Sequence, residues 1–287
     1  MADTTITLLA PAKVNLFLQV IGKRPDNYHD LFSLMCPISL YDTVTLKFRP
    51  DDPSISVDCS APNVPNDDSN LAHKAAAAFM KQWKHEIGLE ISIHKQIPVA
   101  AGLGGGSSDA ATVLLGLNRY FDTPLTQVQL MTLGVSLGAD VPFFVYQKPA
   151  LATGVGEKLE YFAHLKPCRI LLINPGYGVS TAKIFKNLNL RLTKCKKIFK
   201  NSPFNKRGFD AVRHLCNDLE TVTESLHPDI GKAKTVLLKQ GALGALMSGS
   251  GPTVFGLFAD TEDLGEAHNR IKQDFPEWKL YTAELLV

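Results

Sequence analysis

A glycine-rich turn that leads directly into a helix-forming run is the feature that most constrains this sequence. The segment PVAAGLGGGSSD occupies residues 98–109, and AATVLLGLN follows it without a break. The first backbone N–H groups of a helix have no intrahelical partner, and the helix dipole places partial positive charge at the same end. Glycines let the backbone approach a ligand closely. The stretch therefore predicts an anion-binding site, and phosphate is the ligand it favours.

The predicted phosphate site does not match either of the two common phosphate loops. A Walker loop needs a lysine after the glycines, and the dinucleotide-binding pattern needs a glycine where Ser107 stands. A tight corner between strand and helix, in which the glycines only allow close packing, is the alternative interpretation. The residues predicted to bind phosphate are Pro98, Val99, Ala100, Ala101, Gly102, Leu103, Gly104, Gly105, Gly106, Ser107 and Ser108.

Charge and cysteine content narrow the classes of partner. Lysine and arginine number 30 against 28 acidic residues, a formal charge of +2, so we expect no nucleic-acid or membrane partner. The five cysteines form no C-x-x-C pair, and we expect neither a zinc site nor a disulfide framework. The sequence has no apolar run of membrane-spanning length and no secretory leader, which predicts a cytoplasmic protein.

Hydrophobic periodicity predicts an α+β protein with a boundary near residues 154–157. The basic stretch 191–207 is expected to be a solvated loop or helix face. Residues 6–20 are expected to form two strands joined around 11–13. Further strands are predicted at 43–48, 55–58, 89–95, 170–175, 254–258 and 279–286, and helices at 70–84, 107–120, 126–137, from 181, and at 210–220, 228–240 and 263–274.

Three motifs together resemble those of the GHMP small-molecule kinases. Residues 98–110, PVAAGLGGGSSDA, are similar to the second motif of that family, while APAKVNL at 10–16 and MSGSGPTVF at 247–255 are similar to the first and third. The resemblance covers nearly the whole chain. It implies a two-lobed fold, with an ATP-binding lobe of the ribosomal protein S5 domain 2-like type over 1–155 and the last strand, 276–287. A ferredoxin-like lobe over 156–275 would contribute to substrate binding.

Four further stretches resemble one branch of that family. They are PAKVNLFL (11–18), RPDNYHDL (24–31), LGADVPFF (137–144) and GVGE (154–157). Members of this branch phosphorylate the 2-hydroxyl of 4-diphosphocytidyl-2-C-methyl-D-erythritol in the non-mevalonate isoprenoid pathway. The resemblance implies ATP and Mg²⁺, with no dedicated metal ligands beyond a contact from Ser107 or Ser108. It also implies a cytidine diphosphate conjugate as the small-molecule partner, and leaves monomer or homodimer open.

Several other functions are alternatives to this one. Another GHMP kinase, of the homoserine or mevalonate type, shares the motifs. A catalytically silent nucleotide or metabolite sensor could use the same fold, although the chain keeps both Lys13 and Asp140. A Rossmann-type oxidoreductase is the weakest alternative.

The resemblance assigns catalysis to Lys13 and Asp140 jointly. Asp140 would take the proton of the acceptor hydroxyl, and Lys13 would stabilise the developing alkoxide. The structural alternatives are that Asp140 caps a turn or helix and that Lys13 is a surface lysine at a strand end.

The substrate-binding positions implied by the resemblance are Asn15, Tyr28, His29, Thr181 and Phe185, together with Asp140. An imidazole offers both a donor and an acceptor to a pyrimidine edge, and an aromatic ring stacks on cytosine. Phe185 could instead be a core residue, and His29 a loop residue bound to backbone.

The third motif would approach substrate or triphosphate through residues 248–251, unless it is only a tight turn before the strand at 254–258. The lysine-rich run at 194–197 is expected to be a solvated face and is not assigned to the site.

Overall fold

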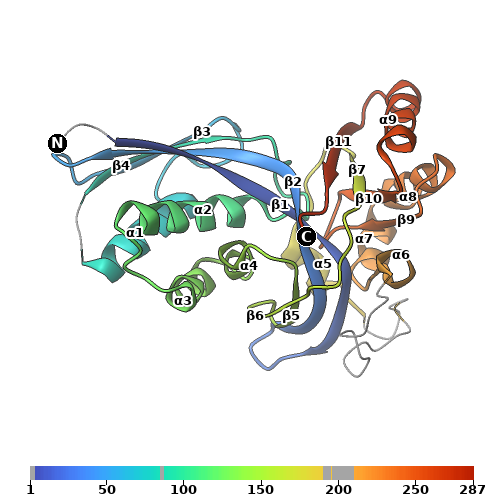
Figure 1. Ribbon diagram of the computed structural model, residues 1–287. Helices are drawn as coiled ribbons and strands as arrows, with labels where there is room; N and C mark the ends of the chain where they lie inside the picture. Colours follow the sequence, from blue (N-terminus) through green and yellow to red (C-terminus); the bar gives the residue numbers. More distant parts are fainter. Residues whose placement is uncertain (1–3, 85–86, 190–194, 196–209) are drawn as a thin grey trace. The chain divides into compact units, whose positions relative to one another are not determined.

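The computed structural model describes residues 4–84, 87–189, 195 and 210–287 (Figure 1). The chain divides into two compact units, each built from several segments. Unit 1 comprises residues 1–12, 41–99 and 104–147, and unit 2 comprises 13–40, 100–103 and 148–287. Two long strands, β1 (Thr4–Lys23) and β2 (His29–Arg49), each give part of their length to each unit.

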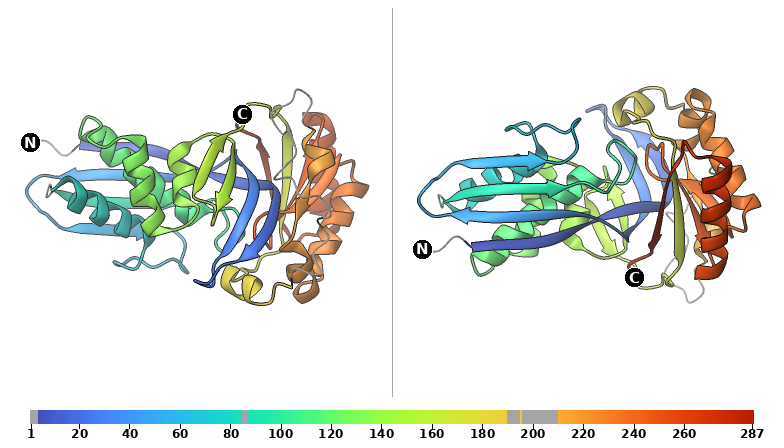
Figure 2. Two further views of the ribbon diagram at one scale, coloured as in Figure 1. Left: turned by 90° about the horizontal axis from the view of Figure 1, so that it is seen from below. Right: turned by 90° about the horizontal axis from the view of Figure 1, so that it is seen from above.

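Unit 1 is a sheet with helices on one face. In this unit β2 pairs antiparallel with β4 (Gly88–His94), and β3 (Ile55–Cys59) lies parallel to β4. Figures 1 and 2 show the helices of this unit gathered on one side of the sheet. Successive side chains of a strand point to opposite faces, so Leu89, Ile91 and Ile93 are buried while Ser92 is exposed. The four helices are α1 (Leu71–Trp83), α2 (Gly105–Tyr120), α3 (Gln127–Leu137) and α4 (Val141–Tyr146).

The starts of α1 and α3 follow from their capping residues. The Asn70 side chain accepts from the backbone N–H of Ala72 at 2.9 Å, which satisfies one amide that the helix itself cannot. Thr126 and Gln129 form a capping box at α3. Both helices lie where the sequence predicts them, within one residue at each end.

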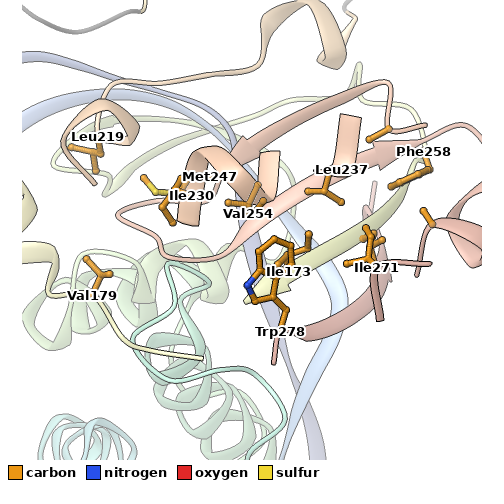
Figure 3. Close-up of a cluster of buried hydrophobic side chains, with 14 of the residues drawn as sticks. Ile173, Val179, Leu219, Ile230, Leu237, Met247, Val254, Phe258, Ile271 and Trp278 are labelled. Atoms are coloured by element: carbon orange, nitrogen blue, oxygen red, sulfur yellow. The ribbon is translucent and has the colours of Figure 1, made fainter. Parts of the chain in front are cut away.

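Unit 2 contains a four-stranded antiparallel sheet in the order β11 (Lys279–Glu284), β7 (Arg169–Asn174), β10 (Val254–Phe258), β9 (Gly244–Met247). Helices α8 (Asp229–Lys239) and α9 (Thr261–Asp274) lie side by side on one face of it (Figure 2). Their apolar side chains, including Leu237 and Ile271, meet Ile173, Val254 and Phe258 of the strands in the core of this unit (Figure 3).

The remainder of unit 2 is organised around β1 and β2. β5 (Ala150–Gly154) pairs with β2 at residues 31–35 and with β6 (Lys158–Tyr161). β8 (Cys216–Asn217) pairs parallel with β1 at Phe17 and Leu18. The helices of this part are α5 (Thr181–Lys186), α6 (Ala211–His214) and α7 (Glu220–Leu226).

Three local predictions are wrong. β1 is one strand that passes through Pro11, because extended backbone accommodates the fixed φ of proline. Residues 210–220 are not one helix: α6 ends at His214 and β8 follows, since pairing with β1 outweighs the local helical pattern. The last strand, β11, pairs along its whole length with β7 of unit 2, whereas we expected it in the first lobe. β7 is buried and needs a partner at each edge. The division at residue 155 remains a prediction.

The cysteines also differ from expectation. Cys195 and Cys216 form a disulfide, although their spacing in the sequence gives no indication that the fold brings them together. Cys36, Cys59 and Cys168 are free thiols. No helix among the described residues is both long and apolar enough to cross a bilayer. The basic stretch 191–207 and the lysines at 194–197 lie outside the described residues, apart from Cys195.

Candidate active site

The glycine-rich turn ends in unit 1 with an uncapped helix start. Gly104 precedes α2 in the left-handed conformation, with φ 74°, and contributes no side-chain cap. Gly106 is exposed and Ser107 half-buried. The Ser108 side chain is fully buried, and its Oγ has no hydrogen-bond partner among the described residues. Bare amides and two hydroxyls at one helix start form the arrangement that the sequence predicts for an anion.

The segment around Asp140 lies next to this helix start. A Cβ atom placed on Gly138 would lie 3.7 Å from Ser107 Oγ. Asp140 occupies the N-cap position of α4, but its carboxylate makes no capping hydrogen bond. The alternative that Asp140 serves as a side-chain cap is therefore wrong, and its catalytic role remains a prediction.

Lys13 belongs to a buried hydrogen-bonded chain in unit 2. It is only 4% exposed, and Nζ donates to Asn15 Oδ1 at 2.6 Å. Asn15 Nδ2 donates to Ser33 Oγ at 2.9 Å, and Ser33 Oγ donates to the carbonyl of Phe17 at 2.7 Å. The alternative of a surface lysine is wrong. The ammonium is instead held at a defined place, where the Asn15 amide oxygen accepts one of its hydrogen bonds.

The third motif meets the first and second motifs inside unit 2. Ser248 Oγ donates to the carbonyl of Gly102 at 3.0 Å, and the Lys13 backbone N–H donates to the Leu103 carbonyl at 3.0 Å. A Cβ atom on Gly249 would lie 3.3 Å from Lys13 Nζ. Gly102, with φ 76°, has no room for a side chain, because a Cβ atom there would collide with the Ser248 carbonyl. The third motif is thus more than a turn before β10: its backbone lies against Lys13.

Two of the residues predicted to bind substrate, His29 and Phe185, come together in unit 2. The rings of His29 and Phe185 stack with centroids 5.1 Å apart. Thr181 Oγ1 and Ser250 Oγ share a hydrogen bond of 2.7 Å, which links α5 to the third motif. The Tyr28 side chain is 61% exposed. Phe185 packs against the core of unit 2 as well, so it serves the core and still presents a ring to His29.

The pKa of His29 is lowered, first by partial burial and then by the positive charge of Lys23. The imidazole is therefore neutral at neutral pH and offers one donor and one acceptor.

Sequence reasoning missed two groups that support this site. Asn217 Nδ2 donates to the carbonyls of Met247 and Gly249, each at 2.8 Å, and so holds the third motif in place. In unit 1, a cluster of Asp42, Lys95 and Asp109 lies behind the start of α2. Asp109 carried a usable signal, since it is an acid at the start of an otherwise apolar helical run. Asp42 and Asn217 carried none, because their partners are distant in sequence.

Comparisons with known proteins identify the family of the chain. Residues 70–148 match the family model of the GHMP kinases N terminal domain, and residues 204–277 match that of the GHMP kinases C terminal. The chain is 50% identical to the 4-diphosphocytidyl-2-C-methyl-D-erythritol kinase of Pelobacter propionicus, over 98% of this chain and 99% of the relative. It is 47% identical to the enzyme of the same name from Syntrophotalea carbinolica, over 97% and 98%.

A solved structure shows the same likeness. The crystal structure of a 4-(cytidine 5'-diphospho)-2C-methyl-D-erythritol kinase superposes with a TM-score of 0.77 at 32% identity, covering 98% of this chain and 99% of the other. The predicted GHMP kinase fold is confirmed. This chain belongs to the GHMP kinases, in the family of the 4-diphosphocytidyl-2-C-methyl-D-erythritol kinases, and is an ATP-dependent small-molecule kinase.

Proposed function

We propose that this protein transfers the γ-phosphoryl group of ATP to the 2-hydroxyl of 4-diphosphocytidyl-2-C-methyl-D-erythritol, giving the 2-phosphate and ADP. The observation that carries the proposal is the near-complete coverage of relatives of that name at 47–50% identity. The position of the buried Lys13 beside the third motif supports it, because two of the three stretches that resemble the family motifs meet there.

The polyphosphate would bind at the glycine-rich turn. Backbone N–H groups at the start of α2 and the helix dipole favour an anion, and the glycines leave space for its oxygens. Mg²⁺ would neutralise charge on the phosphates as they are transferred. The buried Ser108 hydroxyl, which has no partner among the described residues, and the half-buried Ser107 are the groups that fit such an ion.

Lys13 and Asp140 would divide the work on the acceptor hydroxyl. Asp140 takes the proton of the hydroxyl as its oxygen attacks phosphorus, while the ammonium of Lys13 stabilises the charge that develops on that oxygen. The hydrogen bond from Lys13 to Asn15 supports this role, because it holds the ammonium in one orientation.

The cytidine end would be recognised by His29 and Phe185. A neutral imidazole can donate to and accept from the edge of cytosine, and the Phe185 ring offers a stacking surface. Asn15, Tyr28 and Thr181 complete the proposed substrate side. The stacking of His29 on Phe185 supports the proposal, because it shows that the face of the Phe185 ring accepts another planar ring, as it would accept cytosine.

Release of ADP from ATP tests the function. The purified protein is incubated with ATP and Mg²⁺, without an acceptor or with the cytidine conjugate, methylerythritol 4-phosphate, homoserine or mevalonate. We expect ADP release that depends on the cytidine conjugate and is at least a hundredfold slower with the other acceptors. Comparable turnover of homoserine or mevalonate would reject the proposed substrate, and the absence of ADP release with every acceptor would favour a silent sensor.

A further inference from the structure

The loop between β7 and α5, residues 175–180, leads the chain into the helix that holds two of the proposed substrate-binding residues. It has no regular secondary structure, and Gly176, Gly178 and Ser180 in it are exposed. Gly176 is in the left-handed conformation, with φ 95°, and a Cβ atom placed on it would meet nothing within 4 Å. A short segment with two glycines has many accessible conformations. The position of this loop in the folded protein therefore depends on specific contacts.

A buried pair of polar side chains fixes the start of the loop. Asn174 Nδ2, at the end of β7, donates to Thr253 Oγ1 at 3.0 Å, and Asn174 Oδ1 accepts from the Gly176 N–H at 2.8 Å. Asn174 is 3% exposed and Thr253, in the third motif, is fully buried. Because the side-chain amide of Asn174 is bonded at both its nitrogen and its oxygen, its orientation decides where the chain turns after β7.

Two further hydrogen bonds hold the end of the loop. The Val179 N–H donates to the carbonyl of Ala100, in the glycine-rich turn, at 3.0 Å. Thr181, the first residue of α5, shares its hydrogen bond with Ser250 of the third motif. The Val179 side chain also lies in the core of unit 2. The second and third motifs therefore set the place at which α5 begins.

The place of α5 in turn sets the place of the Phe185 ring. The helix has only 6 residues, so a shift of its first residue moves its whole length. Phe185 is one residue from its end and stacks on His29. The apolar contacts of Phe185 with the core are not directional, whereas hydrogen bonds favour one geometry. A ring that is to stack on a planar base needs both a defined position and a defined plane.

Another buried asparagine does the same for a loop that carries no proposed site residue. In unit 1, Asn118 Nδ2 donates to the Leu125 carbonyl at 3.0 Å, and Asn118 Oδ1 accepts from the Leu125 N–H at 2.9 Å. Asn118 is 7% exposed. Asn118 and Asn174 both hold the backbone of a loop, but only Asn174 is also bonded to a motif of the proposed site. The comparison of the two separates positioning from stability.

We propose that Asn174 and Thr253 are positioning residues for the cytidine conjugate. Their hydrogen bond fixes the loop at 175–180, and the loop places the first residue of α5 and the Phe185 ring on the substrate side. The inference rests on the proposed binding of the conjugate by Thr181 and Phe185. Without the hydrogen bond, the binding-competent arrangement is only partly populated, and the apparent affinity falls by that fraction. Saturating conjugate restores the arrangement, so kcat does not change.

Matched variants of the pair test the proposal. Thr253→Val removes the hydroxyl and keeps the shape of the side chain, whereas Thr253→Ser keeps the hydroxyl. Asn174→Ala removes the amide, and Asn118→Ala is its control in unit 1. Steady-state kinetics give kcat and the KM values for ATP and the conjugate. Calorimetry without ATP gives the Kd of the conjugate, and hydrogen exchange reports on the peptide that spans 175–180.

We expect Thr253→Val and Asn174→Ala to raise the KM and the Kd for the conjugate about fivefold, while kcat and the KM for ATP change by less than about twofold. The amides of 175–180 should exchange about tenfold faster in both variants. Thr253→Ser should match wild type in every measurement. Asn118→Ala should keep the wild-type KM values and the wild-type exchange of 175–180.

A folded Thr253→Val protein with an unchanged KM for the conjugate would overturn the positioning role, even if the loop exchanges faster. Equal increases in both KM values, or the same increase in Asn118→Ala, would mean general destabilisation and overturn it as well. If Thr253→Val does not fold, Asn174→Ala against Asn118→Ala decides. Failure of Thr253→Val and Asn174→Ala alike to fold would make the contact purely structural and overturn the proposal. Wild-type protein that neither binds nor phosphorylates the conjugate would reject the proposed function instead, so the two failures are distinguishable.

Discussion

The two units support their glycine-rich segments with different chemistry. In unit 1 a lysine between two carboxylates holds the start of α2. In unit 2 the third motif is held mainly by uncharged groups: Asn217 on two carbonyls, and Thr223 Oγ1 on the carbonyl of Ser250 at 3.2 Å. One carboxylate also takes part, at the first residue of the third motif, where Glu220 accepts a hydrogen bond from the N–H of Met247.

Because one support is charged and the other mainly uncharged, the two units should respond differently to pH and to a bound anion. A buried charged cluster is expensive to desolvate, and its balance shifts with pH or with a bound anion. Amides and hydroxyls do not titrate, so a network built mainly from them depends less on pH. We therefore expect the support of the glycine-rich turn in unit 1 to depend on pH more strongly than the support of the third motif in unit 2.

The largest expected effect is on catalysis, in which we propose that Lys13 and Asp140 act together. Asp140→Asn and Lys13→Met should each lower kcat by roughly 10²–10⁴, because proton transfer and charge stabilisation each fail without their partner. ATP affinity should stay similar in Asp140→Asn. The double variant should be little worse than either single one, since the two act as a unit. Steady-state kinetics measure this, and near-normal turnover of Asp140→Asn would remove it as the base.

The next largest effect is expected on stability, when Asn217, an uncharged residue that holds the third motif of unit 2, is replaced. Asn217→Ala leaves two buried carbonyls without their donor, and we expect it to lower the free energy of unfolding by about 2–3 kcal/mol. The loss should be the same at pH 6 and pH 8, because no ionisable group is removed. Urea denaturation measures it, with exposed Asn269→Ala on α9 as the control. A loss that changed with pH would contradict the contrast between the units.

A smaller effect is expected on substrate affinity. Phe185→Leu keeps apolar bulk against the core of unit 2 and removes the stacking ring, so the KM for the cytidine conjugate should rise about tenfold, while the KM for ATP stays unchanged. Initial rates at varied conjugate concentration test this. An equal rise in both KM values would mean that the substitution disturbs the fold rather than the base.

The smallest expected effect is on the pH dependence of the free energy of unfolding, through Asp109 of unit 1. The pKa of Asp109 lies above that of an unfolded aspartate, so the native state binds the proton more tightly. Its contribution to stability is complete below about pH 4 and is lost as the pH rises through about 7. Between pH 6 and pH 7 the unfolding free energy of wild type should fall relative to that of Asp109→Asn, by about 1 kcal/mol. If the free energy of unfolding of wild type and of Asp109→Asn changed with pH in parallel, Asp109 would not be the group that titrates.

The sequence predicts well whatever depends on local pattern. The helix predicted at 70–84, the alternation through Ile91 and Ile93, and the helix after the glycines all follow from spacing, and the structure confirms them. The glycines themselves predict a site because few other residues tolerate the left-handed conformation seen at Gly102 and Gly104. The resemblance to the family motifs adds the expected chemistry, since no periodicity assigns Lys13 a role in catalysis.

Contacts between segments that are distant in sequence explain the features that the sequence analysis did not predict. Residues 210–220 have helical periodicity, yet Cys216 and Asn217 are drawn into an extended pair with β1, about 200 residues away in sequence. The Asp42–Lys95–Asp109 cluster needs three segments to meet, and no local signal marks Asp42. The disulfide of Cys195 and Cys216 likewise depends on the folded path of the chain.

The place of β11 in its sheet has a consequence for how the protein is made. β7 ends at Asn174, and the strand that completes its outer edge begins at Lys279. At a translation rate of about 5–20 residues per second, those roughly 100 residues take about 5–20 s to emerge. During that interval an apolar edge of the nascent chain waits for its partner, and such edges are sites of aggregation. Ribosomes that stall before the codons of β11 would therefore release a product whose sheet is open at β7, and the cell must remove it or shield it.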